Sequence, residues 1–198
     1  SDIRVASYNV QNLFDARANG SEYPRYDPRG GEWSEALYET KLRNLSRALR
    51  DAGGGALAPP EILALQEVEN RAALAALRNR LGARHYPHGA ASAMPHSAIQ
   101  LALLSRYPIT AVRAHALAHG GFEGLRDILE VRVSLPGERR LRVFVNHWKS
   151  KHGGAAQTEP ARALAARVLE RLTAAAARPG TLVLAAGDFN QAPAAVAL

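Results

Sequence analysis

The chain has 198 residues, of which 47% are hydrophobic, and 25 Lys and Arg residues against 18 Asp and Glu residues give it a formal net charge of +7. The length favours one domain, because a single core stops growing only beyond about 250 residues. No apolar run approaches the roughly 18 residues of a membrane span, and the absence of cysteine excludes disulfide scaffolds, zinc–cysteine sites and thiol catalysis.

The first half of the chain alternates between strand and helix patterns. Residues 3–10 begin with the period-two alternation of a strand and turn polar at their end, whereas residues 15–33 carry no periodicity and are expected to form a surface loop. A helix is expected over 34–51, capped by Ser34 and ended by Gly53–Gly55, because its large side chains recur every three or four residues. A strand buried on both faces is expected at 61–66, and a helix from Asn70 to Gly82.

The second half is a run of expected strands interrupted by one helix. The strands are expected at 98–104, 108–115, 126–134 and 140–145, and a hairpin at Pro136-Gly137 joins the last two. A helix is expected after Thr158, with Pro160 in its first turn, and a final apolar strand at 181–186. This order mixes strand–helix–strand units with a hairpin run, so it predicts an α/β sandwich with mixed sheets.

Four of the expected strands end in polar side chains that can bind ligands. These ends are Ser7–Asn9, Gln66–Glu67, Asn146–Lys149 and Gly187–Asn190. Folds of the α/β class assemble their sites at the carboxyl ends of strands, because the loops there vary while the strands hold them in place. One composite site is therefore favoured over four separate caps and turns. The motifs of serine hydrolases, P-loop NTPases and dinucleotide-binding dehydrogenases are absent.

The candidate metal ligands are hard oxygen donors. Glu67 and Asp188 supply carboxylates, and Asn9 and Asn190 supply neutral amide oxygens, a set that suits Mg²⁺ or Mn²⁺ better than Zn²⁺. Magnesium often binds through only one or two carboxylates plus a substrate phosphate, so a sparse ligand set is expected. The structural alternatives are that Glu67 is a charge at the start of the following helix and that Asp188 forms a turn after its strand.

The candidate phosphate-binding residues are His147, Lys149 and Arg126. The imidazole and the ammonium group would stabilise negative charge on phosphate oxygens, and the forked guanidinium would bind a phosphate through two hydrogen bonds. The alternatives are a solvated loop around His147 and Lys149, which is the favoured interpretation for the neighbouring Lys151 and His152, and an ion pair with an acidic neighbour for Arg126.

Six segments in this order resemble the endonuclease/exonuclease/phosphatase superfamily. They are SYNVQNLFD at 7–15, LALQEVEN at 63–70, LALLSRYP at 101–108, RDILEV at 126–131, FVNHWKSK at 144–151 and GDFN at 187–190. The resemblance spans nearly the whole chain. It implies a four-layer α/β/β/α sandwich, in which two mixed sheets lie face to face with helices outside, and divalent-metal-dependent cleavage of phosphate esters.

The resemblance also implies a role for each site residue. Glu67 would be the principal metal ligand, and Asn9 would support the metal or an oxygen of the scissile phosphate. His147 would contact the phosphate, and Arg126 would be a further substrate-binding residue. Asp188 and Asn190 would position the attacking water and stabilise the transition state.

The sequence departs from the family pattern at its end. Members of this family carry a further Asp-His pair well downstream of GDFN, tied to general-base or phosphate-stabilising duties, whereas this chain stops at Leu198. The expectation is therefore a single domain over 1–198 that is truncated at its C-terminus, with closing strands of the second sheet missing.

The function expected from these observations is hydrolysis of phosphodiester bonds with Mg²⁺ or Mn²⁺, by a nuclease acting on DNA or RNA. The net charge of +7 favours a polyanionic substrate. The alternatives are a phosphoesterase for phospholipids or inositol phosphates, and a catalytically incomplete fragment that binds phosphate or nucleic acid. A monomer without a stable protein partner is expected, and the SYNV-x-NLFD pattern hints at a secreted or periplasmic protein.

Overall fold

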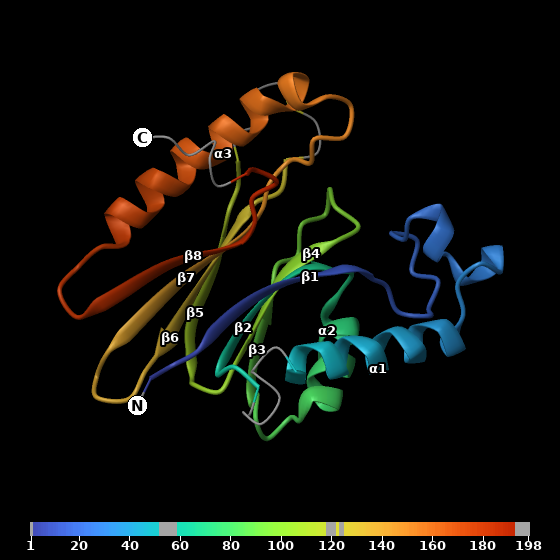
Figure 1. Ribbon diagram of the computed structural model, residues 1–198, viewed down its shortest axis with the longest axis horizontal. Coiled ribbons are helices and arrows are strands. Elements are labelled where there is room, and N and C mark those ends of the chain that lie inside the picture. Colours follow the sequence, from blue (N-terminus) through green and yellow to red (C-terminus); the bar gives the residue numbers. More distant parts are fainter. Residues whose placement is uncertain (1, 52–58, 118–121, 123–124, 193–198) are drawn as a thin grey trace.

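Two four-stranded sheets stack face to face, and helices cover their outer sides (Figure 1). The computed structural model describes residues 2–51, 59–117, 122 and 125–192. The first sheet has the strand order β1-β2-β4-β3 and the second has the order β5-β6-β7-β8. The elements are β1 (Val5–Leu13), α1 (Glu35–Asp51), β2 (Ile62–Val68), α2 (Arg71–Leu81), β3 (His88–Ala91), β4 (Gln100–Ser105), β5 (Ile109–His115), β6 (Ile128–Ser134), β7 (Arg140–His147), α3 (Ala155–Ala176) and β8 (Thr181–Asp188), with two 3₁₀ turns, η1 (Pro24–Tyr26) and η2 (Pro28–Gly30), between β1 and α1.

Each sheet contains one parallel pair of strands. In the first sheet β1 runs parallel to β2, and in the second β7 runs parallel to β8, while the other neighbouring strands are antiparallel. The edge strands β1 and β8 contact each other across the sandwich. Both parallel pairs reach the same end of the sandwich, because Asn9, where the regular pairing of β1 with β2 ends, is hydrogen-bonded to Asp188 at the end of β8.

Apolar side chains fill all three interfaces between the layers. Leu63 and Leu65 of β2 pack under α1 and α2, whereas Ile62 and Ala64 of the same strand pack between the two sheets. A third cluster lies between the second sheet and α3 and includes Phe144. The expected burial of the 61–66 strand on both faces is therefore confirmed, and so is the four-layer α/β/β/α sandwich of two mixed sheets.

The two helices over the first sheet begin where the sequence predicts. The Ser34 hydroxyl accepts a hydrogen bond from the backbone N–H of Leu37 at 3.4 Å, and the Asn70 side chain accepts one from that of Ala73 at 2.9 Å. The predicted end of the first helix at Gly53–Gly55 lies outside the described residues. In the described ranges, none of the helices is both long enough and apolar enough to cross a bilayer.

Two expectations about local structure were wrong, and one strand was not predicted. The third helix begins at Ala155 and not after Thr158, because the Thr158 hydroxyl donates to the Gly154 carbonyl at 2.8 Å within the first turn instead of capping it. Strand β3 was not predicted, since its sequence HGAA has neither β-branched nor aromatic residues. Arg126 lies outside any strand, because β6 begins at Ile128.

The segment expected as a surface loop at 15–33 is held by aromatic contacts. The ring of Phe14 stacks on that of Tyr26 with a centroid distance of 4.7 Å, and Tyr26 meets the edge of Trp33 at 5.1 Å. The buried Glu69 carboxylate accepts hydrogen bonds from the backbone N–H of Asp15 and from the side chain of Asn19. These contacts fix the loop beside the ends of β1 and β2.

Candidate active site

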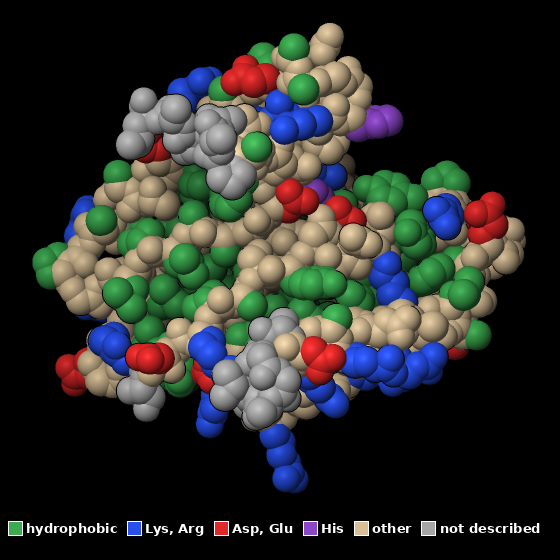
Figure 2. Space-filling view, viewed as in Figure 1, with side chains coloured by type: hydrophobic (Ala, Val, Ile, Leu, Met, Phe, Trp, Pro, Cys, Tyr) green, Lys and Arg blue, Asp and Glu red, His purple; other side chains and the backbone are tan. Residues whose placement is uncertain are grey.

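Two carboxylates meet on one amide group at the end of the sandwich. The Asn9 Nδ2 donates to Glu67 Oε1 at 2.8 Å and to Asp188 Oδ2 at 3.1 Å. Glu67 comes from β2 in the first sheet and Asp188 from β8 in the second, so the contact joins both sheets. Figure 2 shows acidic side chains beside a histidine between the two halves of the sandwich.

The backbone of the GDFN segment fixes the second carboxylate. Asp188 Oδ1 accepts a hydrogen bond from the backbone N–H of Asn190 at 2.9 Å, and the Asn190 side chain donates to the Trp148 carbonyl at 3.0 Å. His147 is the register partner of Asp188 on the parallel strands β7 and β8. The structure therefore brings Asn9, Glu67, His147, Asp188 and Asn190 together.

His147 is a buried imidazole, with 5% of its surface exposed. Burial, together with the nearby charge of Arg126, lowers its pKa to about 4, and the charge of Asp188 opposes both effects. The ring is therefore neutral near pH 7, and its Nε2 lies 3.6 Å from Glu67 Oε1, a contact that is not an ion pair in this protonation state. Its Nδ1 is buried without a hydrogen-bond partner in the described part of the chain.

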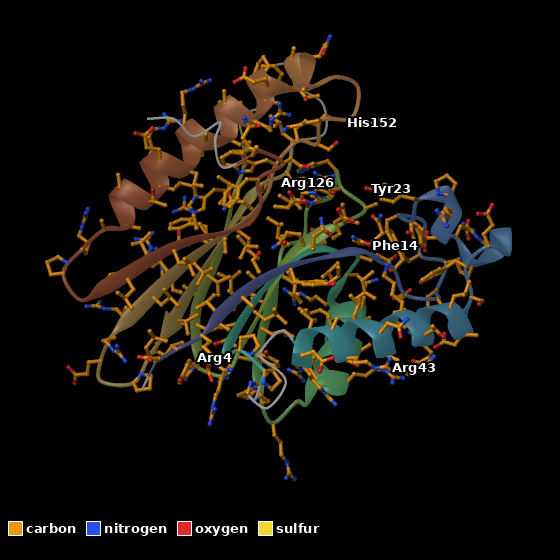
Figure 3. All side chains as sticks on the ribbon, in the orientation of Figure 1. Arg4, Phe14, Tyr23, Arg43, Arg126 and His152 are labelled. Atoms are coloured by element: carbon orange, nitrogen blue, oxygen red, sulfur yellow. The ribbon has the colours of Figure 1, made fainter. Side chains whose placement is uncertain are left out.

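The two predicted substrate-binding residues differ in their surroundings. Arg126 has a buried Nε without a hydrogen-bond partner among the described residues, and its charge reaches His147. Figure 3 places Arg126 at the same end of the sandwich as Phe14 and Tyr23.

Lys149 is half-buried. The exposed His152 lies further out, on the segment before α3, which agrees with the solvated loop expected there.

The predicted neutral oxygen of Asn9 is used within the protein. Asn9 Oδ1 accepts a hydrogen bond from the backbone N–H of Gln11 at 2.8 Å, so its nitrogen faces the carboxylates. Asn9 is thus placed as a donor that orients Glu67 and Asp188, and its oxygen already accepts one hydrogen bond from the backbone.

Backbone strain gathers at this end of the sandwich. Among the described non-glycine residues, positive φ angles occur at Glu67 (67°), Asn190 (48°), Gln11 (54°) and Asn12 (61°), and away from the site at Glu138. The strands β1 and β2 also lose their regular register beside Asn9 and Gln66. Such strain persists only where the surrounding structure determines it, and it is typical of functional sites.

Gly187 lets the parallel strands approach beside the site. A Cβ atom at this position would lie 2.0 Å from the carbonyl oxygen of Asn146, and its φ of 142° disfavours any other residue. Asn146 is fully buried, and its side chain donates to the carbonyls of Phe144 and Ala186 and accepts from the Trp148 indole.

We expect Gly187→Ala to destabilise the protein by about 4 kcal/mol, because the clash involves backbone atoms that cannot move aside. Gly180→Ala is the matched control. Gly180 also has a positive φ, but its Cβ would meet nothing within 4 Å, so only the backbone cost of about 1 kcal/mol applies. Urea unfolding of both variants measures the difference, and equal losses would show that the close approach at Gly187 does not matter.

The donor set fits a hard divalent cation with few protein ligands. The part of the chain that the structure describes contains no group of three His, Cys, Asp or Glu side chains that could hold a metal ion, which disfavours a zinc cage. Two carboxylates beside one neutral amide match the one or two carboxylates that Mg²⁺ or Mn²⁺ uses when a substrate phosphate completes its shell.

Sequence reasoning missed Lys41. Its ammonium group donates to the Gln11 carbonyl, and burial lowers its pKa while the Glu67 carboxylate opposes that effect. The feature of the sequence that could have revealed this lysine is its position in α1. Lys41 lies three residues after Tyr38 and four before Leu45, which places a charge on the buried face of the helix.

The fold is thus a sandwich of two mixed sheets that presents carboxylate, amide and imidazole groups at one end. A sequence profile described as the Endonuclease/Exonuclease/phosphatase family matches residues 4–198. The chain belongs to this family.

Solved structures with this fold come from animals and bacteria. A humanized D. rerio TDP2 has a TM-score of 0.66 at 19% identity, with 98% of this chain and 69% of that chain covered. The beta toxin of Staphylococcus aureus, in a hairpin deletion mutant, has a TM-score of 0.66 at 16% identity, with coverages of 97% and 68%. The human Nocturnin catalytic domain with bound sulfate has a TM-score of 0.56 at 21% identity, with 96% of this chain and 66% of that chain covered.

These identities support the fold alone. The chain spans 49% of the length of TDP2 from Caenorhabditis elegans, of which it resembles the corresponding part with a TM-score of 0.65. Among curated proteins, no sequence matches the chain.

Proposed function

We propose that the protein hydrolyses phosphodiester bonds with the help of Mg²⁺ or Mn²⁺, and that its substrate is nucleic acid. The observation that carries this proposal is the meeting of two kinds of group at one end of the sandwich. Glu67 and Asp188 are carboxylates that share the amide of Asn9. Next to them are His147, whose Nε2 lies 3.6 Å from Glu67 Oε1, and Arg126, and each has a buried nitrogen atom without a partner among the described residues. The carboxylates suit a cation, and the nitrogen groups suit a phosphate anion.

Glu67 would hold the metal ion, with Asn9 orienting its carboxylate. When bound, the ion would supply positive charge that polarises the phosphorus–oxygen bond and offsets charge on the phosphate. Asn9 keeps Glu67 and Asp188 close together although both are negative, which a cation would favour.

The remaining residues would act on the phosphate and on water. A neutral His147 carries one ring N–H, which would donate to a phosphate oxygen, and Arg126 would bind another. Asp188 is held on both oxygens, by Asn9 and by the backbone of Asn190. It would accept a hydrogen bond from a water and so position that water for in-line attack on phosphorus. Lys149, which is half-buried beside His147, would bind substrate outside the reacting group.

The choice of nucleic acid as substrate is supported by the charge and by the family. The formal net charge of +7 strengthens binding of a phosphate polymer through release of counterions. The family name covers endonucleases and exonucleases, and one similar structure, ANGEL2, is described as a 2′,3′-cyclic phosphatase.

The test is a panel of phosphodiesters. Plasmid DNA, a structured RNA, bis(4-nitrophenyl) phosphate and sphingomyelin vesicles are each incubated with the protein in Mg²⁺, in Mn²⁺ or in EDTA. We expect cleavage of nucleic acid and of the small diester in either metal, and none in EDTA. Cleavage of sphingomyelin alone would overturn the choice of substrate. Binding of nucleic acid without cleavage of any diester would overturn the proposed hydrolysis.

A further inference from the structure

The outer face of the second sheet is only partly covered by α3. The helix packs against β7 and β8, as Figure 1 shows, through a cluster that includes Phe144. Glu130 of β6 is the register partner of Phe144 and also of Arg113 on β5, so their side chains point to the same outer face. Among the described residues, α3 contacts only β7 and β8 extensively, and Arg113 of β5 and Arg132 of β6 are exposed on the part of this face that continues beyond the helix.

This open surface carries five arginines and one carboxylate. We call it the Arg132 face, and its residues are Arg113 of β5, Glu130 and Arg132 of β6, Arg140 and Arg142 of β7, and Arg178 in the turn before β8. More than half of the formal net charge of +7 thus lies on one side of one sheet.

A buried carboxylate fixes two of these guanidinium groups. Glu130 is 1% exposed. Its Oε1 accepts hydrogen bonds from Arg132 Nε at 2.8 Å and from Arg142 Nε at 2.9 Å. Its Oε2 lies 2.8 Å from His115 Nε2. Burial alone would raise the pKa of Glu130, but its hydrogen bonds to Arg132 and His115 and the charge of Arg142 hold that pKa below the usual value. The two guanidiniums are oriented before any ligand arrives, which lowers the entropic cost of binding.

Beside this network lies a groove of about 220 Å³, which contains no acidic side chain. Most of the residues that line it are basic or carry a hydroxyl group. They include Arg132, Arg140, Arg142 and Arg178, with Thr110 and Thr181. Arginine forks and hydroxyl groups are the donors that bind phosphate oxygens of a nucleic-acid backbone.

A second basic cluster on the helices is less suited to this role. Arg43, Arg47, Arg50 and Arg80 gather between α1 and α2, but Asp51 lines the same hollow and Glu39 pairs with Arg80. The acids offset the charge there. Within the described residues, only the Arg132 face combines an excess of arginine with a buried carboxylate that orients it.

A membrane surface is a poorer occupant for the Arg132 face. Peripheral membrane binding usually adds exposed aromatic or aliphatic side chains to a basic surface. Among the described residues, the large exposed hydrophobic side chains Tyr8, Tyr23 and Leu37 belong to the N-terminal part of the chain. Val112 and Leu182 lie on strands of the second sheet, but they pair with Val131 and Leu141, which face the other sheet.

We propose that the Arg132 face is a second, non-catalytic surface that binds the phosphate backbone of nucleic acid. The groove lies at the start of β7 and β8, and the candidate active site lies at their ends, at His147 and Asp188. Eight-residue strands place the two about 23 Å apart. The identity of the polymer rests on the proposed function, whereas the affinity of the face for a phosphate backbone rests on its own residues.

The experiment measures binding without catalysis. Fluorescence anisotropy of a labelled 20-base-pair duplex in EDTA compares the wild type with Arg140→Gln/Arg178→Gln, which leaves the Glu130 network intact. We expect the variant to raise Kd about tenfold at low salt and to reduce the slope of log Kd against log salt by about 1 to 2. Arg167→Gln/Arg171→Gln is the matched control, because it removes the same charge from the exposed side of α3.

The outcomes separate a local surface from a general charge effect. A tenfold rise in the Kd of the groove variant, with a change of less than twofold in the Kd of the control, supports the proposal. Equal losses of affinity in both double variants overturn it. The proposal is also overturned if the groove variant loses binding to phosphatidylserine vesicles but keeps its affinity for the duplex. Turnover of bis(4-nitrophenyl) phosphate is expected to be unchanged in the groove variant. If no diester is cleaved at all, the proposed function fails, but the anisotropy measurement still decides the role of the Arg132 face.

Discussion

Replacing Glu67 with glutamine is expected to remove metal binding and to lower kcat/KM for a phosphodiester at least 10³-fold, or about 4 kcal/mol in activation free energy. The wild type in Mn²⁺ at a hundred times its Kd should gain about 2.7 kcal/mol of stability, which raises Tm by roughly 5 to 10 °C. Glu67→Gln should lose this gain, because Glu67 supplies the charged oxygen that would hold the ion. Thermal unfolding with and without Mn²⁺ measures the effect and requires no catalysis.

The control for Glu67→Gln is Glu159→Gln on the exposed side of α3, which removes the same charge away from the site. It should keep both the Mn²⁺-induced rise in Tm and the activity. In EDTA, Glu67→Gln should unfold at a temperature no lower than the wild type, because Glu67 and Asp188 repel each other across the shared amide of Asn9. Full activity of Glu67→Gln in Mg²⁺ would show that the metal assignment is wrong.

His147→Ala is expected to lower kcat by a factor of about 10² to 10³, because it removes a donor to the phosphate that the fold holds in place before substrate binds. Its response to Mn²⁺ should differ from that of Glu67→Gln. The Mn²⁺-induced rise in Tm should persist, since the carboxylates and Asn9 remain in place. The two variants therefore test two roles separately, metal binding by Glu67 and phosphate binding by His147.

The matched control for His147→Ala is His152→Ala, since His152 lies five residues further along and is exposed. It should retain activity within twofold of the wild type. Two results would refute the assignment of His147: an equal loss in both variants, or a loss of the Mn²⁺ response in His147→Ala while its Tm in EDTA stays near that of the wild type.

The meeting of the site residues could be predicted from the sequence, because each of them follows an expected strand. Parallel strands carry the residues after them to the same edge of a sheet, so the polar ends at Asn9, Glu67 and Asp188 were expected to meet. Hydrogen bonds from Asn9 to both carboxylates confirm that meeting. Burial of the 61–66 strand on both faces was predictable for a similar reason, since a short continuous apolar run needs cover on each side.

Other features depend on contacts that a sequence pattern does not contain. The orientation of the Asn9 amide is set by the backbone N–H of Gln11, whose φ of 54° is a product of tertiary packing. Strand β3 pairs with β4 although its residues have low strand propensity. The Arg132 face depends on the register of β5, β6 and β7, which brings side chains from three strands around Glu130.

The most direct test of the shared site of Glu67 and Asp188 is anomalous diffraction from crystals of the protein soaked in Mn²⁺. The account predicts one manganese peak bound by the Glu67 carboxylate, next to Asn9 and Asp188. A peak at other residues, or a Glu67 carboxylate without metal at a saturating Mn²⁺ concentration, would contradict it.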